Sequence, residues 1–249
     1  MQIKQFAEMI KECNDIVFFG GAGVSTESGI KDYRSKDGIY NTVKDFGVSP
    51  EEILSRSFFE RHPDVFYDFH RQYFMVDAEP NDAHKALAEL ENNNKLSAVI
   101  TQNIDRLHQK AGSKNVIELH GTTTEYICHQ CKKSVRTVYD VEKEIVDGKI
   151  PKCEYCGGIV RPKVVLYEEM LHEGVIENAI YHVENADMII VGGTSLVVQP
   201  AASIISYFRG KYLVIINKTE TGYDGRADLI IRDSIGKVFA EAMRTINGG

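Results

Sequence analysis

Short apolar runs alternate with amphipathic segments along most of this chain. Each run has the length of a buried strand, and several of the segments between them carry apolar residues at helical spacing. Apolar strands that alternate with helices are typical of a parallel sheet covered on both faces. The predicted strands cover residues 16–19, 98–101, 116–119, 188–191, 212–216 and 227–231, and the predicted helices cover residues 2–13, 82–92, 200–208 and a last segment that ends near Ile246.

Four of the five cysteines form two Cys-x-x-Cys knuckles, Cys128 with Cys131 and Cys153 with Cys156. Four thiolates in two close pairs suit a tetrahedral Zn²⁺ ion, and a closed four-cysteine site leaves no open position for catalysis. We therefore expect one structural zinc ion. His129 lies inside the first knuckle and is the alternative ligand, although the cysteine count is already complete.

Two stretches, residues 49–76 and the cysteine-containing residues 122–165, interrupt the alternation of strands and helices. Residues 49–76 begin with a helix-start signal, Ser-Pro-Glu-Glu, and are rich in Phe and Tyr, which favours the core of a small helical lobe over a substrate channel. The fold class we expect is α/β, a Rossmann-like doubly wound parallel sheet with a smaller inserted lobe. The predicted large domain comprises residues 1–35, 82–120 and 166–249, with a helical insertion at 36–81 and a zinc-binding insertion at 121–165.

The stretch that follows the first predicted strand is rich in glycine and small hydroxyl residues. Residues 20–23 read Gly-Gly-Ala-Gly, and Ser25, Thr26 and Ser28 come next, which suits the start of a helix whose N-terminus attracts phosphate. The pattern fits a diphosphate cradle and an ordinary turn equally well, because the third glycine of the dinucleotide fingerprint is missing.

Charge and hydropathy exclude two classes of function. The chain has 249 residues and a net charge of −7, whereas a protein that binds nucleic acid directly should carry a basic face. The longest apolar runs are too short to cross a bilayer, and the N-terminal segment does not resemble a signal peptide. We expect a cytoplasmic monomer that binds neither nucleic acid nor membrane, with Cys13 as a small buried hydrophobe.

Several motifs together resemble the sirtuin family of NAD-dependent protein lysine deacylases. They are GAGVSTESGI at 21–30, Asp32-x-Arg34, TQNID at 101–105, IELHG at 117–121, the four cysteines, and GGTSLVVQPAA at 192–202. The resemblance covers nearly the whole chain, with the motifs in the family's order. It implies that NAD is a co-substrate bound in the cleft between the lobes, and that the partners are proteins or peptides carrying acyl-lysine.

The resemblance also implies roles for individual residues. It makes His120 the general base, with Asn103 as a second catalytic residue beside the reacting ribose. The residues expected to contact NAD are Ala22, Gly23, Thr26, Tyr33, Arg34, Gln102, Ile104, Asp105, Thr194, Ser195, Asn217, Lys218, Ser234 and Ile235. The residues expected to contact the substrate peptide are Val164, Val165, Leu166 and Tyr167.

The chain departs from the family's pattern at several positions. The strand expected to bind the peptide, residues 164–169, has Glu168 where the family has glycine, so its side chain either narrows the groove or points outward. Lys31 replaces a proline, and Tyr33 adds a hydroxyl to the aromatic position. Tyr67 and Arg71 miss by one residue the spacing of the branch that removes succinyl groups, so we expect an uncharged acyl group, acetyl first.

The leading prediction is thus an NAD-dependent protein lysine deacetylase that releases nicotinamide and O-acyl-ADP-ribose. Two alternatives remain open at this point. One is a protein mono-ADP-ribosyltransferase that uses the same NAD site, and the other is a non-catalytic NAD-sensing module.

Overall fold

The computed structural model describes residues 1–32, 39, 47–133 and 135–248, and the chain forms two compact units. Unit 1 comprises Met1–Asp32, Ala78–Leu119 and Leu171–Gly249, and unit 2 comprises Tyr33–Asp77 and His120–Met170. Among the described residues, this division differs from the sequence-based one at His120 and residues 166–170, which belong to unit 2, and at residues 78–81, which belong to unit 1.

Unit 1 is built on a six-stranded parallel sheet with the order β3-β2-β1-β7-β8-β9. From β1 the chain adds β2 and β3 on one side, and it then returns to place β7, β8 and β9 on the other side. The reversal between β1 and β7 is a topological switch point, where loops at the carboxyl ends of the strands separate and ligands commonly bind. The strands are β1 Ile16–Gly20, β2 Leu96–Thr101, β3 Val116–Glu118, β7 Met188–Gly192, β8 Tyr212–Ile216 and β9 Leu229–Ile231.

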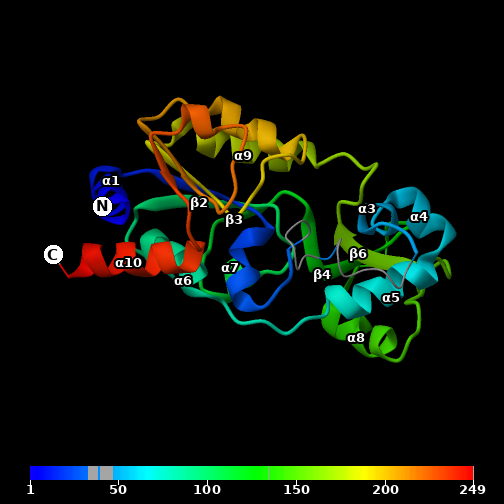
Figure 1. Ribbon diagram of the computed structural model, residues 1–249. Coiled ribbons are helices and arrows are strands. Elements are labelled where there is room, and N and C mark those ends of the chain that lie inside the picture. The colour runs from blue at the N-terminus through cyan, green and yellow to red at the C-terminus, as the bar shows by residue number, and fades with distance from the viewer. Residues whose placement is uncertain (33–38, 40–46, 134, 249) are drawn as a thin grey trace. The chain divides into compact units, whose positions relative to one another are not determined.

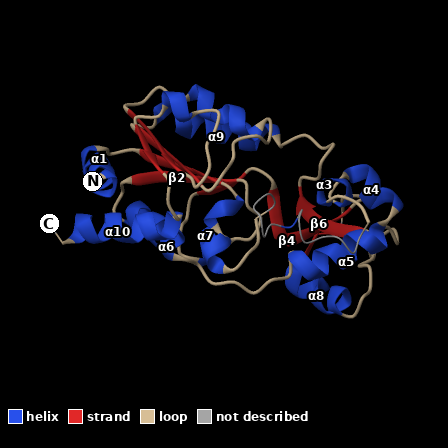
Figure 2. Ribbon diagram, viewed as in Figure 1, coloured by secondary structure: helices blue, strands red, loops and turns tan. Residues whose placement is uncertain are grey.

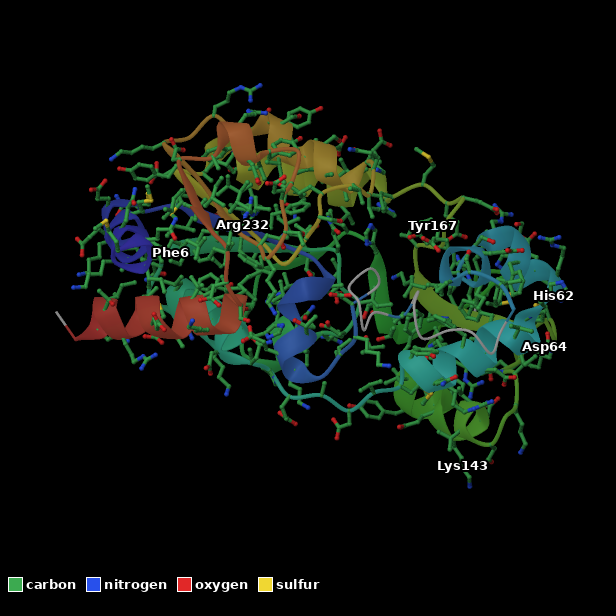
Figure 3. All side chains as sticks on the ribbon, viewed as in Figure 1. Phe6, His62, Asp64, Lys143, Tyr167 and Arg232 are labelled. Atoms are coloured by element: carbon green, nitrogen blue, oxygen red, sulfur yellow. The ribbon has the colours of Figure 1, made fainter. Side chains whose placement is uncertain are left out.

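Helices cover both faces of this sheet (Figures 1 and 2). On one face lie α1 (Gln2–Glu12), α6 (Asp82–Asn92) and α10 (Ile235–Asn247), and on the other lies α9 (Glu173–Asn185). Phe6 of α1 points toward α10 (Figure 3). Its ring packs edge-on against that of Phe239, with the ring centroids 5.6 Å apart, and the centroids of Phe239 and Phe18 of β1 are 6.1 Å apart. Each such side chain stabilises the fold by about 1.5–3 kcal/mol when fully buried.

Unit 2 contains a three-stranded antiparallel sheet with the order β5-β4-β6. In the described part of the chain, four helices belong to this unit. Several of the aromatic residues predicted to form a helical core are buried there, among them Phe59, Phe66, Tyr67 and Phe69. The strands are β4 Gly121–Cys128, β5 Val135–Thr137 and β6 Val160–Val164, and the helices are α3 Pro50–Ile53, α4 Arg56–Arg61, α5 Pro63–Tyr73 and α8 Val138–Val146.

Local capping explains where several helices begin. The side chain of Ser49 accepts the N–H of Glu52 at the start of α3, and the side chain of Asn81 accepts the N–H of Ala83 at the start of α6. His84 completes a capping box by accepting the Asn81 N–H. Among the described residues, no helix combines the length and the hydropathy that a membrane span requires.

Two predicted helices differ in kind from the observed ones. The segment after the glycines forms two short 3-10 helices, Ala22–Val24 and Thr26–Ser28, instead of the first turn of a longer helix. Gly29 adopts a left-handed conformation (φ 86°) that ends the second of them. The helix predicted at residues 200–208 is also a 3-10 helix, η3 (Ala201–Tyr207).

Candidate functional site

The glycine-rich loop of unit 1 packs directly against the loop that follows β7. The N–H of Gly23 donates to the carbonyl of Gly193 at 2.8 Å, and the N–H of Gly21 donates to that of Gly192 at 3.2 Å. A Cβ on Gly23 would lie 2.8 Å from the Gly193 backbone, and one on Gly193 would lie 2.3 Å from the Val24 nitrogen. Only glycine permits this close approach, which brings the two loops together at the switch point.

The residues expected beside phosphate lie on this loop. Ala22, Gly23 and Thr26 are half-buried, and the Thr26 hydroxyl donates to the carbonyl of Gly23 at 2.9 Å. Ala22 and Gly23 lie in one short 3-10 helix and Thr26 begins the next, and the first N–H group of each such helix has no intrahelical partner. Small side chains and backbone donors at this edge of the sheet are suited to a diphosphate.

A polar cluster lies beside the glycine loop. The hydroxyl of Ser25 donates to the Asp105 carboxylate at 2.6 Å, and the side-chain amide of Asn103 donates to the Ser25 hydroxyl and to the Gly21 carbonyl, both at 3.1 Å. The second Asp105 oxygen accepts the N–H of Leu107 at 2.9 Å. These bonds tie the loop after β2, which carries Gln102, Asn103, Ile104 and Asp105, to the loop after β1.

Burial raises the pKa of Asp105, while its hydrogen bonds from Ser25 and Leu107 act in the opposite direction. The carboxylate retains lone pairs after these two bonds, so it can still accept an amide N–H from a ligand. Ser25 is not among the residues expected from the sequence to contact NAD. The signal for it was its position four residues after Gly21, within the same conspicuous motif.

Residues expected near the adenosine half of NAD lie at the ends of β7, β8 and β9. Thr194 is buried and its hydroxyl accepts the N–H of Leu196 at 3.2 Å, while Ser195 is half-buried. Asn217 follows β8 and its side-chain amide donates to the Thr219 carbonyl at 3.0 Å. Lys218 is exposed, Ser234 is half-buried, and Ile235 is buried within the core cluster of unit 1.

Arg232 is a residue that the sequence analysis missed (Figure 3). Its guanidinium donates to the backbone carbonyls of Asn217 at 3.1 Å and Thr219 at 2.8 Å, and it pairs with Asp224. These contacts hold the loop after β8. No local sequence signal pointed to Arg232, because its partners are 8 to 15 residues away in the chain.

In unit 2, His120 immediately precedes strand β4 and is half-buried. The next residue, Gly121, has φ 76°, and a Cβ at this position would lie 2.1 Å from the Lys163 carbonyl oxygen. The backbone of β4 can therefore reach β6 only with glycine here. The close approach places His120 beside the end of β6, where its carbonyl accepts the Val165 N–H at 2.9 Å.

Of the strand predicted over residues 164–169, only Val164 lies in a strand, because β6 (Val160–Val164) ends there. Beyond it the chain pairs with the start of α4. The Tyr167 N–H donates to the Leu54 carbonyl, and the Tyr167 carbonyl accepts the Arg56 N–H, both at 3.0 Å. Val164 and Leu166 are buried, Val165 is half-buried and Tyr167 is exposed. Glu168 points toward α4, where its carboxylate accepts hydrogen bonds from Ser57.

The four cysteines of the two knuckles come together in unit 2. All four Sγ atoms lie within 4.8 Å of one another, with Cys128 and Cys156 at 3.5 Å and Cys131 and Cys153 at 3.7 Å. Four sulfurs at about 2.3 Å from a central ion would be spaced in this way, whereas disulfide sulfurs are about 2.05 Å apart. The cluster fits a Zn²⁺ ion.

His129 does not take part in this cluster. Its Nε2 lies 3.0 Å from the Glu60 carboxylate, and its ring packs edge-on against Phe59. The donor set is therefore four thiolates, the combination typical of a structural zinc site. The fifth cysteine, Cys13, is buried in unit 1.

A comparison with known protein families matches residues 21–200 to the Sir2 family. The chain belongs to the Sir2 family. Its relatives include proteins named NAD-dependent protein deacetylase from Clostridium perfringens, 54% identical over 97% of this chain and 98% of the relative, and from Staphylococcus aureus, 43% identical over 97% and 98%.

Solved Sir2 structures resemble this chain over its full length. One, of Sir2 with a p53 peptide and NAD⁺, has a TM-score of 0.89 and 38% identity, and the match covers 100% of both chains. Another, of a Sir2 variant with a deacetylated p53 peptide and 3′-O-acetyl-ADP-ribose, has a TM-score of 0.88 and 40% identity, with 98% of each chain covered. The Sir2 likeness extends over the parallel sheet, the small antiparallel sheet and the cysteine cluster.

Within this Sir2 chain, two of the expected NAD contacts, Tyr33 and Arg34, lie outside the described residues. The other expected contacts fall on the loops that follow β1, β2, β7 and β8 and on the start of α10, all in unit 1. His120, the peptide segment and the cysteines fall in unit 2.

Proposed function

We propose that this protein removes acetyl groups from lysine side chains of proteins in an NAD-dependent reaction that releases nicotinamide and O-acyl-ADP-ribose. The observation that carries the proposal is the cluster of Ser25, Asn103 and Asp105 beside the glycine loop at the switch point. The proposal is also supported by the 54% identity of this chain to a relative named NAD-dependent protein deacetylase.

The NAD molecule lies along the carboxyl ends of the parallel strands in this proposal. Ala22, Gly23 and Thr26 flank the phosphates, together with Arg34, and Tyr33 faces the nicotinamide. Gln102 and Asn103 contact the reacting ribose. Ile104 and Asp105 hold the carboxamide, Asp105 through the lone pairs that its carboxylate retains. The residues on the adenosine side are Thr194, Ser195, Asn217, Lys218, Ser234 and Ile235.

The chemistry begins with attack of the acyl-lysine carbonyl oxygen on ribose C1′, and the bond to nicotinamide breaks. His120 then accepts a proton from a ribose hydroxyl, so that the 2′ oxygen attacks the former carbonyl carbon. Hydrolysis frees the lysine amine and leaves the acyl group on ADP-ribose. An imidazole can take up a proton near neutral pH, so it suits the role of base.

The acyl group in this proposal is uncharged. Tyr67 is buried and its hydroxyl donates to the Val160 carbonyl, and Arg71 donates to the Ile145 carbonyl at 3.0 Å. Both side chains therefore bond to backbone carbonyls of unit 2 and do not form a pair directed at an acidic acyl group. The peptide carrying the acyl-lysine contacts Val164, Val165, Leu166 and Tyr167.

The zinc ion in this proposal is held by Cys128, Cys131, Cys153 and Cys156 and stabilises unit 2 without entering the reaction. Because the ion requires thiolates, a reducing compartment favours the site, which supports a cytoplasmic location. We further propose a monomer that binds no nucleic acid directly, in keeping with the net charge of −7.

The test incubates the protein with NAD and a panel of peptides carrying acetyl-, propionyl- or succinyl-lysine. We expect equal amounts of nicotinamide and deacylated peptide, with the acyl mass on the ADP-ribose product and the acetyl peptide preferred over the succinyl one. ADP-ribose mass added to the peptide would instead indicate a transferase. NAD binding without turnover of any peptide would indicate a sensing module.

A further inference from the structure

Glu168 adopts a backbone conformation that residues other than glycine rarely take. Its φ is 73°, in the left-handed region where the Cβ of an L-residue is crowded by its own backbone. The residue follows Tyr167 in the segment that leaves β6, and it is exposed. Since no burial of the side chain offsets the strain, the surrounding hydrogen bonds must hold this conformation.

Those hydrogen bonds come from the first turn of α4. One oxygen of the Glu168 carboxylate accepts the Ser57 N–H at 2.9 Å, and the other accepts the Ser57 hydroxyl at 2.8 Å. The preceding N–H of the helix, that of Arg56, donates to the Tyr167 carbonyl at 3.0 Å. Two backbone donors that a helix start leaves without intrahelical partners are thus satisfied by residues 167 and 168.

The next residue holds the segment from the opposite direction. The Glu169 carboxylate accepts from one nitrogen of the Arg161 guanidinium with both of its oxygens, at 2.8 and 2.9 Å. One of these oxygens also accepts the Leu166 N–H at 3.0 Å. Arg161 is a buried residue of β6, only 7% exposed. Two consecutive glutamates therefore clamp Leu166 and Tyr167, one to helix α4 and the other to strand β6.

We infer that Glu168 is a positioning residue for the acyl-lysine peptide. The inference rests on the proposed function, in which the peptide contacts residues 164–167. By capping α4, the Glu168 carboxylate holds Leu166 and Tyr167 in one conformation, so that binding a peptide orders less of the protein and loses less entropy. Glu168 acts through its bonds to Ser57, and its negative charge makes no required contact with the substrate.

The test measures steady-state kinetics with an acetyl-lysine peptide and NAD for Glu168→Ala and Glu168→Gln. Loss of a carboxylate hydrogen-bond pair in Glu168→Ala should raise the peptide KM by about tenfold, with kcat and the KM for NAD nearly unchanged. A glutamine can accept the Ser57 N–H and donate to the Ser57 hydroxyl, so Glu168→Gln should keep a peptide KM near that of the wild type. Ser57→Ala, which removes only the hydroxyl bond, should give an intermediate value.

Each other outcome overturns the inference. An unchanged peptide KM in Glu168→Ala shows that the clamp has no effect on the substrate. Equal changes in the KM values for peptide and NAD show a general loss of folding. A Glu168→Gln variant as impaired as Glu168→Ala shows that the charge itself is recognised. The wild-type protein is assayed alongside, and its failure to release nicotinamide would contradict the proposed function itself.

Discussion

The backbone carbonyl of His120 accepts a 2.9 Å hydrogen bond from the N–H of Val165. This bond extends the pairing of β4 with β6 by one step beyond Gly121 and Val164. The proposed general base and the proposed peptide segment are therefore joined through the backbone, within one unit of the protein. A change that separates β4 from β6 at this point should disturb both together.

Gly121→Ala should separate the two strands. The added Cβ would lie 2.1 Å from the Lys163 carbonyl oxygen, at a φ of 76° that alanine disfavours. We expect a loss of more than about 3 kcal/mol in the free energy of unfolding, because backbone strain and a backbone clash add. Gly148→Ala is the matched control, since its φ is 77° but its closest neighbour would be the Arg71 guanidinium at 3.9 Å. Thermal unfolding that affects the two variants equally would contradict this account.

His120→Ala should lose deacylation by a factor on the order of 10² or more, because the ribose hydroxyl then lacks its proposed general base. The affinity for NAD, measured by calorimetry, should stay close to that of the wild type. His172→Ala provides the control, since His172 is exposed and lies just before α9 in unit 1. Near-normal turnover in His120→Ala would refute the role of His120 as base.

Ser25→Ala should shift the pH dependence of NAD use. Burial raises the pKa of Asp105, and the hydrogen bond from Ser25 opposes that rise. Without the hydroxyl, the Asp105 pKa rises further, so the carboxylate is protonated at a higher pH and can no longer accept the proposed hydrogen bond from the nicotinamide carboxamide. We expect the acid limb of kcat/KM for NAD to move to higher pH, while the alkaline limb stays in place. If kcat/KM for NAD only decreases, with no shift of its acid limb, Ser25 does not control the protonation of Asp105.

Removal of the zinc ion should unfold unit 2 and abolish activity. The four Sγ atoms lie within 4.8 Å of one another, and without the ion their thiolates would repel one another or take up protons. Metal analysis should find one zinc per chain in the wild type and in Cys13→Ala, whose cysteine lies outside the cluster, and much less in Cys156→Ser. A folded, active, metal-free protein would contradict the structural role of the metal.

The parallel sheet could be predicted from the sequence because its strands are apolar throughout. The runs at 16–19, 188–191 and 212–216 become β1, β7 and β8, whose residues are almost all buried. The cysteine cluster was predictable for a similar reason, since each knuckle is a local pattern with one strong chemical meaning.

The features that the sequence did not reveal depend on contacts between distant residues. Glu168 bonds to Ser57, which is 111 residues away, and Arg232 holds the loop at Asn217 from just beyond the end of β9. The end of β6 at Val164 likewise reflects the pairing of Tyr167 with Leu54, in a helical segment far along the chain. Local periodicity carries no information about such partners, so strand length and side-chain direction at 164–169 could not be predicted.

Buried histidines should make the protein less stable in mild acid. Burial lowers the pKa of His70 in unit 2 and of His84 in unit 1 to about 4, from an ordinary value of 6.5. Between these values the unfolded chain binds protons that the folded chain does not, so stability is full above about pH 6.5 and falls as the pH drops toward 4. The loss is on the order of 3 kcal/mol for each histidine.

His84→Gln isolates one of these contributions. The imidazole of His84 accepts the Asn81 N–H at the start of α6, and glutamine is a natural partner in a capping box, so the helix start is kept while the titrating group is removed. Urea unfolding at pH 7 and at pH 5 should show a smaller difference in the free energy of unfolding for His84→Gln than for the wild type. His172→Gln, at an exposed position, should retain the full difference. If all three proteins lose the same stability in acid, the burial of His84 is not its cause.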